Sequence, residues 1–163
     1  MKVIGLDMAV RQTRKIDYNG LIKEAIRALD TCYPPDAKLR YAAAVLTDKG
    51  NIYCGSNYGS DTASLLLHGE QTALVHAANH KDPNIVAIAI VGQGEAILPV
   101  STVAVKEGKG FAYPCGICRQ LIWENALRSG HKVEVIMANL QGKYIVKDIE
   151  SLVPHPWPEK RKK

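Results

Sequence analysis

Two short stretches of the sequence carry residues that could bind a metal ion. His68 and Glu70 stand two residues apart in "LLLHGEQTAL", and Cys115 and Cys118 stand three apart in "YPCGICRQLIWE". One imidazole and two thiolates are ligands that zinc prefers, and a zinc ion with three protein ligands keeps a fourth position open for catalysis. We therefore expect His68, Cys115 and Cys118 to hold Zn²⁺ as a catalytic ion.

Glu70 is expected to lie beside these ligands without being one of them. A carboxylate next to a catalytic metal can take a proton from the attacking water and pass it on. The order His-x-Glu followed by Pro-Cys-x-x-Cys is the signature of zinc-dependent nucleobase deaminases, and it occupies positions 68–70 and 114–118 here. Glu70 is therefore the predicted catalytic residue.

The secondary structure must bring together positions that are 115 − 68 = 47 residues apart. Periodic apolar residues predict helices, the last of which ends at Gly130. Runs of β-formers and apolar residues predict five strands. The predicted helices are 17–31, 68–80 and 115–129, and the predicted strands are 41–47, 51–56, 84–92, 133–139 and 143–149. Successive helices of β-α-β units can begin at one edge of a sheet, where the predicted ligands would meet.

This order of elements indicates an α/β protein, with a mixed five-stranded sheet in a three-layer αβα sandwich. The first two strands form an antiparallel hairpin, and the later alternation of strands and helices predicts parallel pairing. We expect a single domain over 1–163, with basic tails at about 1–16 and 158–163. Gly92-Gln93-Gly94 lacks the third glycine of a dinucleotide-binding loop and is expected to be an ordinary turn.

The composition is that of an ordinary globular domain, with 163 residues, 47% hydrophobic and 23% charged. No apolar run is long enough for a signal peptide or a membrane span, so we expect a cytoplasmic protein without a membrane partner. The net charge of +5 and the pI of about 9.0 raise the question of nucleic acid. Four of the cations lie in the last five residues, so we interpret them as a solvated tail and expect no nucleic-acid partner.

Over roughly residues 20–157 the sequence resembles the cytidine deaminases, in particular their short-chain, homotetrameric members. The resemblance lies in "PCGICRQ" followed by Glu124, in "AAAVLTDKGNIYCGSN" and in "SLVPHPW". It implies zinc-dependent hydrolytic deamination of cytidine or deoxycytidine to uridine or deoxyuridine plus ammonia. A place in pyrimidine salvage, a small aminopyrimidine nucleoside as partner and a homotetramer are implied as well.

The same resemblance assigns the expected substrate contacts. Asn57 stands 68 − 57 = 11 residues before the first ligand, at the place of the family's ribose-binding asparagine. The Gly69 N–H would bind the ring carbonyl, and Leu39 stands where a phenylalanine packs on the ring. Trp157 stands where an aromatic residue near the C-terminus closes the pocket of another subunit.

The first departure from the family pattern concerns the metal site. Short-chain members usually read C-A-E-R at the first ligand, whereas this chain reads H-G-E-Q at 68–71. Zinc with two thiolates and a neutral imidazole sums to zero charge. Such a site has no need of an arginine, so Gln71 in that place is compatible with zinc chemistry.

A second departure concerns the sugar. The family's N-x-E-N motif reads Asn57-Tyr58-Gly59-Ser60, so the glutamate that binds a sugar hydroxyl is replaced by Gly59. The nearest alternative is therefore the same reaction on another aminopyrimidine, such as blasticidin S or a modified cytosine. Ranked below it are a polynucleotide-editing deaminase and a non-enzymatic zinc-stabilised binding domain. The last would require a fourth protein ligand and leave Glu70 without a role.

Overall fold

The computed structural model describes residues 15–60, 65–94 and 110–158, so nearly all of both predicted basic tails lies outside the described residues. Five strands form the main sheet in the order β2-β1-β5-β6-β7, and two short strands pair separately. The helices are α1 Tyr18–Ala28, the 3₁₀ turn η1 Leu29–Thr31, α2 Gly69–Asn79, α3 Gly116–Ser129 and α4 Ile149–Leu152. The strands are β1 Leu39–Thr47, β2 Ile52–Ser56, β3 Tyr58–Gly59, β4 Leu66–Leu67, β5 Ile85–Gly94, β6 Glu134–Ala138 and β7 Tyr144–Asp148.

The strand pairing confirms the predicted mixed sheet. β1 pairs antiparallel with β2 and with β5, β5 pairs parallel with β6, and β6 pairs antiparallel with β7. Helix α2 lies between β2 and β5 in the chain, and helix α3 lies between β5 and β6. Because β5 and β6 are parallel neighbours, they need such a crossover connection. The alternation of the sequence therefore produced one parallel pair within an otherwise antiparallel sheet.

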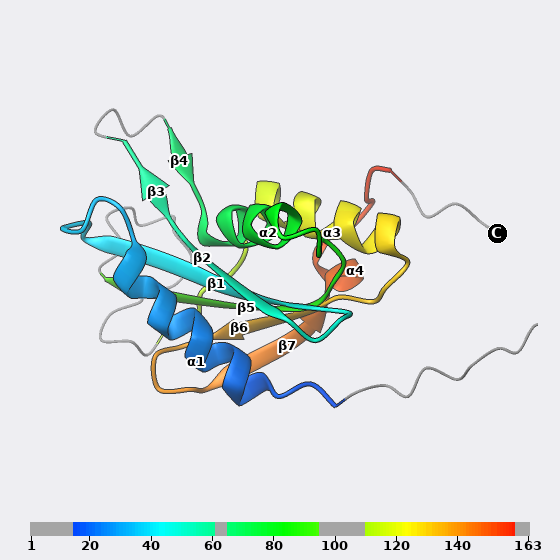
Figure 1. The fold of residues 1–163 in the computed structure, drawn as a ribbon, viewed down its shortest axis with the longest axis horizontal. Coiled ribbons are helices and arrows are strands. Elements are labelled where there is room, and N and C mark those ends of the chain that lie inside the picture. Colours follow the sequence, from blue (N-terminus) through cyan, green and yellow to red (C-terminus); the bar gives the residue numbers. More distant parts are fainter. Residues whose placement is uncertain (1–14, 61–64, 95–109, 159–163) are drawn as a thin grey trace, which may run out of the picture.

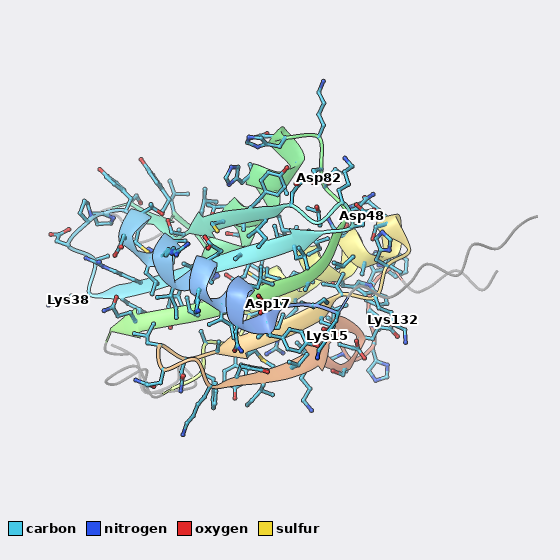
Figure 2. All side chains as sticks on the ribbon, turned by 60° about the horizontal axis from the view of Figure 1, so that its bottom comes forward. Lys15, Asp17, Lys38, Asp48, Asp82 and Lys132 are labelled. Atoms are coloured by element: carbon cyan, nitrogen blue, oxygen red, sulfur yellow. The ribbon has the colours of Figure 1, made fainter. Side chains whose placement is uncertain are left out.

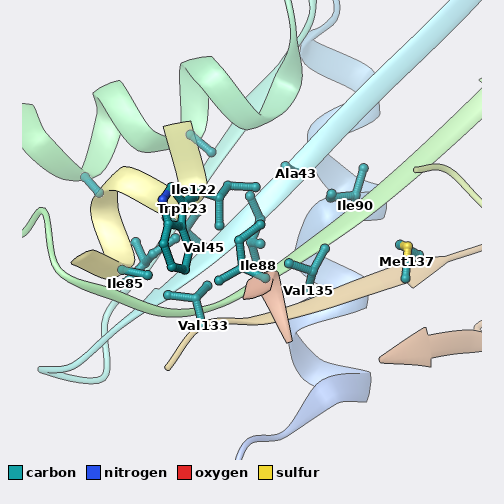
Figure 3. Packing of buried hydrophobic residues seen from close by; sticks show 14 of the residues in the cluster. Ala43, Val45, Ile85, Ile88, Ile90, Ile122, Trp123, Val133, Val135 and Met137 are labelled. Carbon is teal, nitrogen blue, oxygen red and sulfur yellow. The ribbon is translucent and has the colours of Figure 1, made fainter. Parts of the chain in front are cut away.

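Helices cover both faces of the sheet, so the expected three layers are confirmed (Figure 1). On one face, Leu21, Ile22 and Ala25 of α1 pack in a core with even-numbered residues of β1. On the other face, Ile122 and Trp123 of α3 join a core with residues of β1, β5 and β6, as Figure 3 shows. None of the helices in the described part of the chain has the length and hydrophobicity to span a bilayer.

Two local differences from the sequence prediction occur at the same end of the sheet. β1 begins at Leu39, and β5 continues to Gly94 because the two strands pair from Leu39↔Gly94 onward. The prediction of a turn at 92–94 was therefore wrong. The antiparallel partner strand pairs with both glycines, and local sequence does not reveal such a partner. The short elements β3, β4 and α4 were also not predicted.

At the far end of α2, a buried carboxylate fastens the helix to the β1–β2 hairpin. Asp82 Oδ2 accepts hydrogen bonds of 2.8 Å from Thr47 Oγ1 and from Asn51 Nδ2. Burial by itself raises the pKa of Asp82, but these bonds and the Lys49 ammonium lower it overall, so the carboxylate is charged at neutral pH. Figure 2 shows Asp82 at the opposite end of the molecule from Lys38.

Candidate active site

The three predicted ligands lie at the starts of two helices. His68 is the N-cap of α2 and Cys115 is the N-cap of α3, and both have extended backbone conformations. Cys118 lies in the first turn of α3, on the same helical face as Cys115. His68 Nδ1 is 3.4 Å from Cys115 Sγ and 3.5 Å from Cys118 Sγ. The structure therefore brings together side chains that are 47 residues apart in sequence.

This spacing fits a zinc ion. Tetrahedral coordination with usual zinc–nitrogen and zinc–sulfur distances separates nitrogen from sulfur by about 3.6 Å. The observed separations agree with that value, and all three donor atoms lie within 4.8 Å of one another. The donor set and its geometry thus fit Zn²⁺ with a fourth position left open.

The thiol of Cys118 shows why a cation is needed here. Burial, followed by the negative charges of Glu70 and Cys115, raises the pKa of Cys118 far above its ordinary value. A divalent ion bound between the donors reverses the balance, because a thiol that coordinates such an ion is deprotonated.

Glu70 lies in the first turn of α2 and is only 4% exposed. Burial raises the pKa of its carboxyl group, while its own backbone N–H, His68 and a hydrogen bond with Cys118 act in the opposite direction. Glu70 is therefore in contact with the ligand group but is not among the three clustered donors. This is the placement that the predicted proton-transfer role requires.

Gly69 allows α2 to begin directly on the backbone of β1. A Cβ atom at this position would lie 2.7 Å from Ala42 Cα and 3.0 Å from Ala43 N. Both alanines are fully buried, and their small side chains permit this close approach. The glycine that replaces the family's usual alanine therefore fixes the height of His68 and Glu70 above the sheet.

Gln71 has a role that the sequence analysis missed. Its Oε1 accepts a hydrogen bond of 2.7 Å from the backbone N–H of His68. This is half of the reciprocal capping box, in which a residue at N3 binds the N-cap backbone. The spacing of His68 and Gln71 was the available signal, because a glutamine three residues after an N-cap is typical of that motif. Gln71 thus holds the first ligand in place.

Asn57, the predicted sugar-binding residue, is 5% exposed and is fixed by three hydrogen bonds. Its Oδ1 accepts from the Tyr41 N–H at 2.7 Å, its N–H donates to the Tyr41 carbonyl at 2.8 Å, and its own carbonyl accepts from the Tyr33 N–H at 3.0 Å. The first of these bonds occupies the side-chain oxygen of Asn57. The Nδ2 donor is then the group of Asn57 that can serve a substrate.

The two apolar residues predicted to contact substrate differ in their surroundings. Leu39 is the first residue of β1 and is half-buried, on the same face of the strand as Tyr41. The Trp157 side chain is 80% exposed, so it is not buried in a pocket of its own chain. The Trp157 carbonyl accepts a hydrogen bond from Gln120 Nε2, and Trp123 Nε1 donates to the Pro158 carbonyl at 3.0 Å. Helix α3 therefore holds the segment that carries Trp157.

A buried glutamate beside a His-Cys-Cys group, at two helix starts on one face of a mixed sheet, defines a zinc-dependent deaminase. Residues 16–131 match the model of the cytidine and deoxycytidylate deaminase zinc-binding region. The chain belongs to the cytidine and deoxycytidylate deaminase family. The family that the sequence resembled, its fold class and its zinc-dependent chemistry are thereby confirmed.

Individual relatives cover most of the chain. A cytidine deaminase of Halalkalibacterium halodurans is 30% identical over 139 residues, which are 85% of this chain and 92% of that protein. A cytidine deaminase of Sporosarcina psychrophila is 31% identical over 139 residues, 85% of this chain and 90% of that protein. Among solved structures, the cytidine deaminase from Burkholderia pseudomallei is 28% identical with a TM-score of 0.70, covering 87% of this chain and all of its own. That from Mycobacterium tuberculosis, 21% identical with a TM-score of 0.67 over 89% of this chain and 100% of its own, supports the fold alone.

Proposed function

We propose that the protein hydrolyses the exocyclic amino group of cytidine and deoxycytidine, releasing uridine or deoxyuridine and ammonia. The observation that carries this proposal is the buried Glu70 carboxylate beside three converging metal donors. The curated relatives with matching length, both named cytidine deaminase, support cytidine as the substrate. Apart from Gly59 in place of the sugar-binding glutamate, no observation in the described part of the chain bears on blasticidin S, a modified cytosine or a polynucleotide.

We propose that His68, Cys115 and Cys118 hold the zinc ion. When bound, zinc supplies a Lewis acid that makes water nucleophilic at neutral pH and stabilises negative charge on oxygen. Glu70 takes one proton from the attacking water and delivers it to N3 of the ring as the water oxygen bonds to C4. Glu70 then carries the second water proton to the departing amino group, so that the C4–N bond breaks and ammonia leaves.

Three further groups are proposed to orient the nucleoside. The Gly69 N–H lies at the positive N-terminus of α2 and is suited to bind the ring carbonyl oxygen. Asn57 Nδ2 is proposed to donate to a sugar hydroxyl, since Asn57 Oδ1 is already bonded to Tyr41. Leu39 is proposed to contact the ring from the start of β1.

We also propose that the active unit is a homotetramer in which Trp157 closes the pocket of a neighbouring subunit. Its support is apolar surface near the ligands: Leu66 and Leu67 are about half exposed, Ile117 is 65% exposed, and Trp157 is 80% exposed. Such surface indicates contact with another protein chain. A cytoplasmic location is proposed because the four cysteines are free thiols, which persist in a reducing compartment. A role in pyrimidine salvage is proposed because the products of the proposed reaction are pyrimidine nucleosides.

The decisive experiment compares the parent with Glu70→Ala, using ammonia release from cytidine, deoxycytidine and blasticidin S together with bound zinc per chain. The variant should keep its zinc while kcat on cytidine falls by about 10²–10⁴-fold or more, because proton transfer is lost but the ligands remain. Cys118→Ser is the matched variant and should lose zinc and activity together. Loss of zinc from Glu70→Ala, near-normal turnover by it, or a parent active on blasticidin S alone would contradict the proposal.

A further inference from the structure

Tyr41 lies between the proposed sugar-binding residue and the proposed catalytic residue. Its backbone N–H and carbonyl are both bonded to Asn57, at 2.7 and 2.8 Å. The next residues along β1, Ala42 and Ala43, lie directly under Gly69 at the start of α2. Asn57 thus fixes the backbone of Tyr41. Gly69 packs on the two residues that follow Tyr41, and Glu70 is the residue after Gly69.

The ring of Tyr41 is equally constrained. It packs against the core on the α2 and α3 face of the sheet and is half-buried. A Cβ atom added to Gly92 would lie 2.7 Å from Tyr41 Cε1 and 3.5 Å from Ala112 Cβ. The ring therefore lies over the glycine of β5, and Ala112 belongs to the segment that leads into the cysteine ligands. This contact gives Gly92, wrongly expected in a turn, its reason to lack a side chain.

The electrostatics place the ring near the catalytic carboxylate. Burial and the charge of Glu70 raise the pKa of the Tyr41 hydroxyl. The phenol is accordingly neutral at physiological pH. A half-buried, uncharged aromatic ring on the Glu70 side of the sheet is the type of group that lines small-molecule sites.

We infer that Tyr41 is a specificity-determining residue whose ring forms one side of the base pocket and limits the size of the pyrimidine. The inference rests on the proposed function. C4 and N3 must face the zinc ligands and Glu70, the C2 carbonyl is assigned to Gly69, and N1 carries the sugar. The edge left for the Tyr41 ring is therefore C5–C6.

The test measures binding of the product class, which requires no turnover. Uridine, 5-methyluridine and 6-methyluridine are titrated calorimetrically into the zinc-loaded parent, Tyr41→Val, Tyr41→Leu and Tyr41→Phe. In the parent, at least one methyl group should weaken binding by about tenfold or more, since a pocket discriminates one methyl group by that order. Both aliphatic variants should reduce this ratio about tenfold, and Tyr41→Phe should keep it.

The matched control is Tyr53→Val. Tyr53 is a half-buried tyrosine of the neighbouring strand β2, and its ring contacts His76 and His80 near the end of α2. Tyr53→Val should leave the methyl ratio unchanged. Zinc content and thermal stability of each variant show whether the site is intact.

The possible outcomes separate a pocket residue from a merely structural one. A general loosening of the site would weaken all three uridines equally, and an unchanged ratio in both Tyr41→Val and Tyr41→Leu would overturn the inference. An equal change in Tyr53→Val would overturn it too. A parent that shows the ratios but releases no ammonia from cytidine contradicts the proposed function and leaves Tyr41 as a pocket residue, whereas a parent that binds no uridine contradicts both.

Discussion

Glu70 and Cys118 are two neighbouring ionisable groups whose charged forms are disfavoured by their surroundings. Burial raises the pKa of Glu70 and of Cys118, and the charges of Glu70 and Cys115 raise that of Cys118 further. A zinc ion offsets the two thiolates and lets the carboxylate act as a proton carrier. An imidazole as the proposed third ligand would add no charge of its own, which agrees with Gln71 in place of an arginine.

Gly59 stands where the family motif has a glutamate that binds a hydroxyl group of the sugar. It lies in β3, two residues after Asn57, and its N–H donates to the Tyr33 carbonyl at 2.9 Å. A Cβ atom there would meet Leu66 Cδ1 at 3.3 Å and the Tyr33 carbonyl oxygen at 3.7 Å. The end of a leucine side chain can move by a few tenths of an ångström, so a longer side chain fits.

We predict that the parent discriminates weakly between cytidine and analogues with a shortened or altered sugar, and that Gly59→Glu raises kcat/KM on cytidine relative to cytosine. A carboxylate that binds a sugar hydroxyl is worth about tenfold or more. Ser60→Glu is the control, since it places the same charge on the next residue, which points to the other side of an extended chain. Strong sugar discrimination by the parent, with no gain from Gly59→Glu, would show that another residue binds the sugar.

Helices α2 and α3 both contribute residues to the site from their first turns. The start of α2 is tightly packed against β1, whereas the start of α3 has open space beside it. Each begins with a glycine directly after a proposed ligand: Gly69 follows His68, and Gly116 follows Cys115. A Cβ atom at Gly69 would collide with the backbone of β1, whereas one at Gly116 would meet no atom within 4 Å. The two glycines are thus a natural pair for testing what close packing contributes.

We predict that Gly69→Ala lifts the start of α2 from β1, lowers the free energy of unfolding by about 1–3 kcal/mol and reduces kcat by about tenfold or more. Gly116→Ala should keep kcat and leave the free energy of unfolding unchanged or higher, because alanine favours a helix over glycine. Denaturant unfolding of zinc-saturated protein and cytidine kinetics measure both. Equal effects of the two substitutions would mean that the approach of α2 to β1 does not position Glu70.

At the scale of the whole molecule, the exposed apolar surface and the C-terminal segment point to assembly. Arg119 Nη1 donates to the Leu152 carbonyl at 3.5 Å and Gln120 Nε2 to the Trp157 carbonyl, so residues just after the two clustered cysteines also hold the C-terminal segment. Trp157 is presented outward by this arrangement rather than folded into its own chain. That placement suits contact with a second subunit.

We predict a mass of about 71 kDa by light scattering, four times the chain mass of 17.8 kDa.

Trp157→Ala should raise KM for cytidine without loss of zinc. Subunits carrying Glu70→Ala, mixed and reassembled with subunits carrying Trp157→Ala, should regain turnover at low cytidine concentration, because some hybrid sites then combine Glu70 of one chain with Trp157 of another. A monomeric mass at micromolar concentration, or no regain on mixing, would contradict a shared site.

The sequence by itself was sufficient for the long elements and for the residues proposed as metal ligands. Apolar periodicity predicted the three long helices and all five strands of the main sheet to within a few residues. The pattern His-x-Glu and Cys-x-x-Cys indicated zinc chemistry, because few residue types bind zinc and their spacing at helix starts restricts where they can meet. These features are local, so local sequence records them.

Tertiary structure decided what depends on contacts between distant segments. The extension of β5 through Gly94 follows from its pairing with Leu39, and the need for glycine at positions 69 and 92 follows from what packs against each. The placement of Tyr41 between Asn57 and Glu70 has no signature in the sequence. An ordinary strand residue gains a place in the site only when a helix start, a neighbouring strand and a buried amide converge on it.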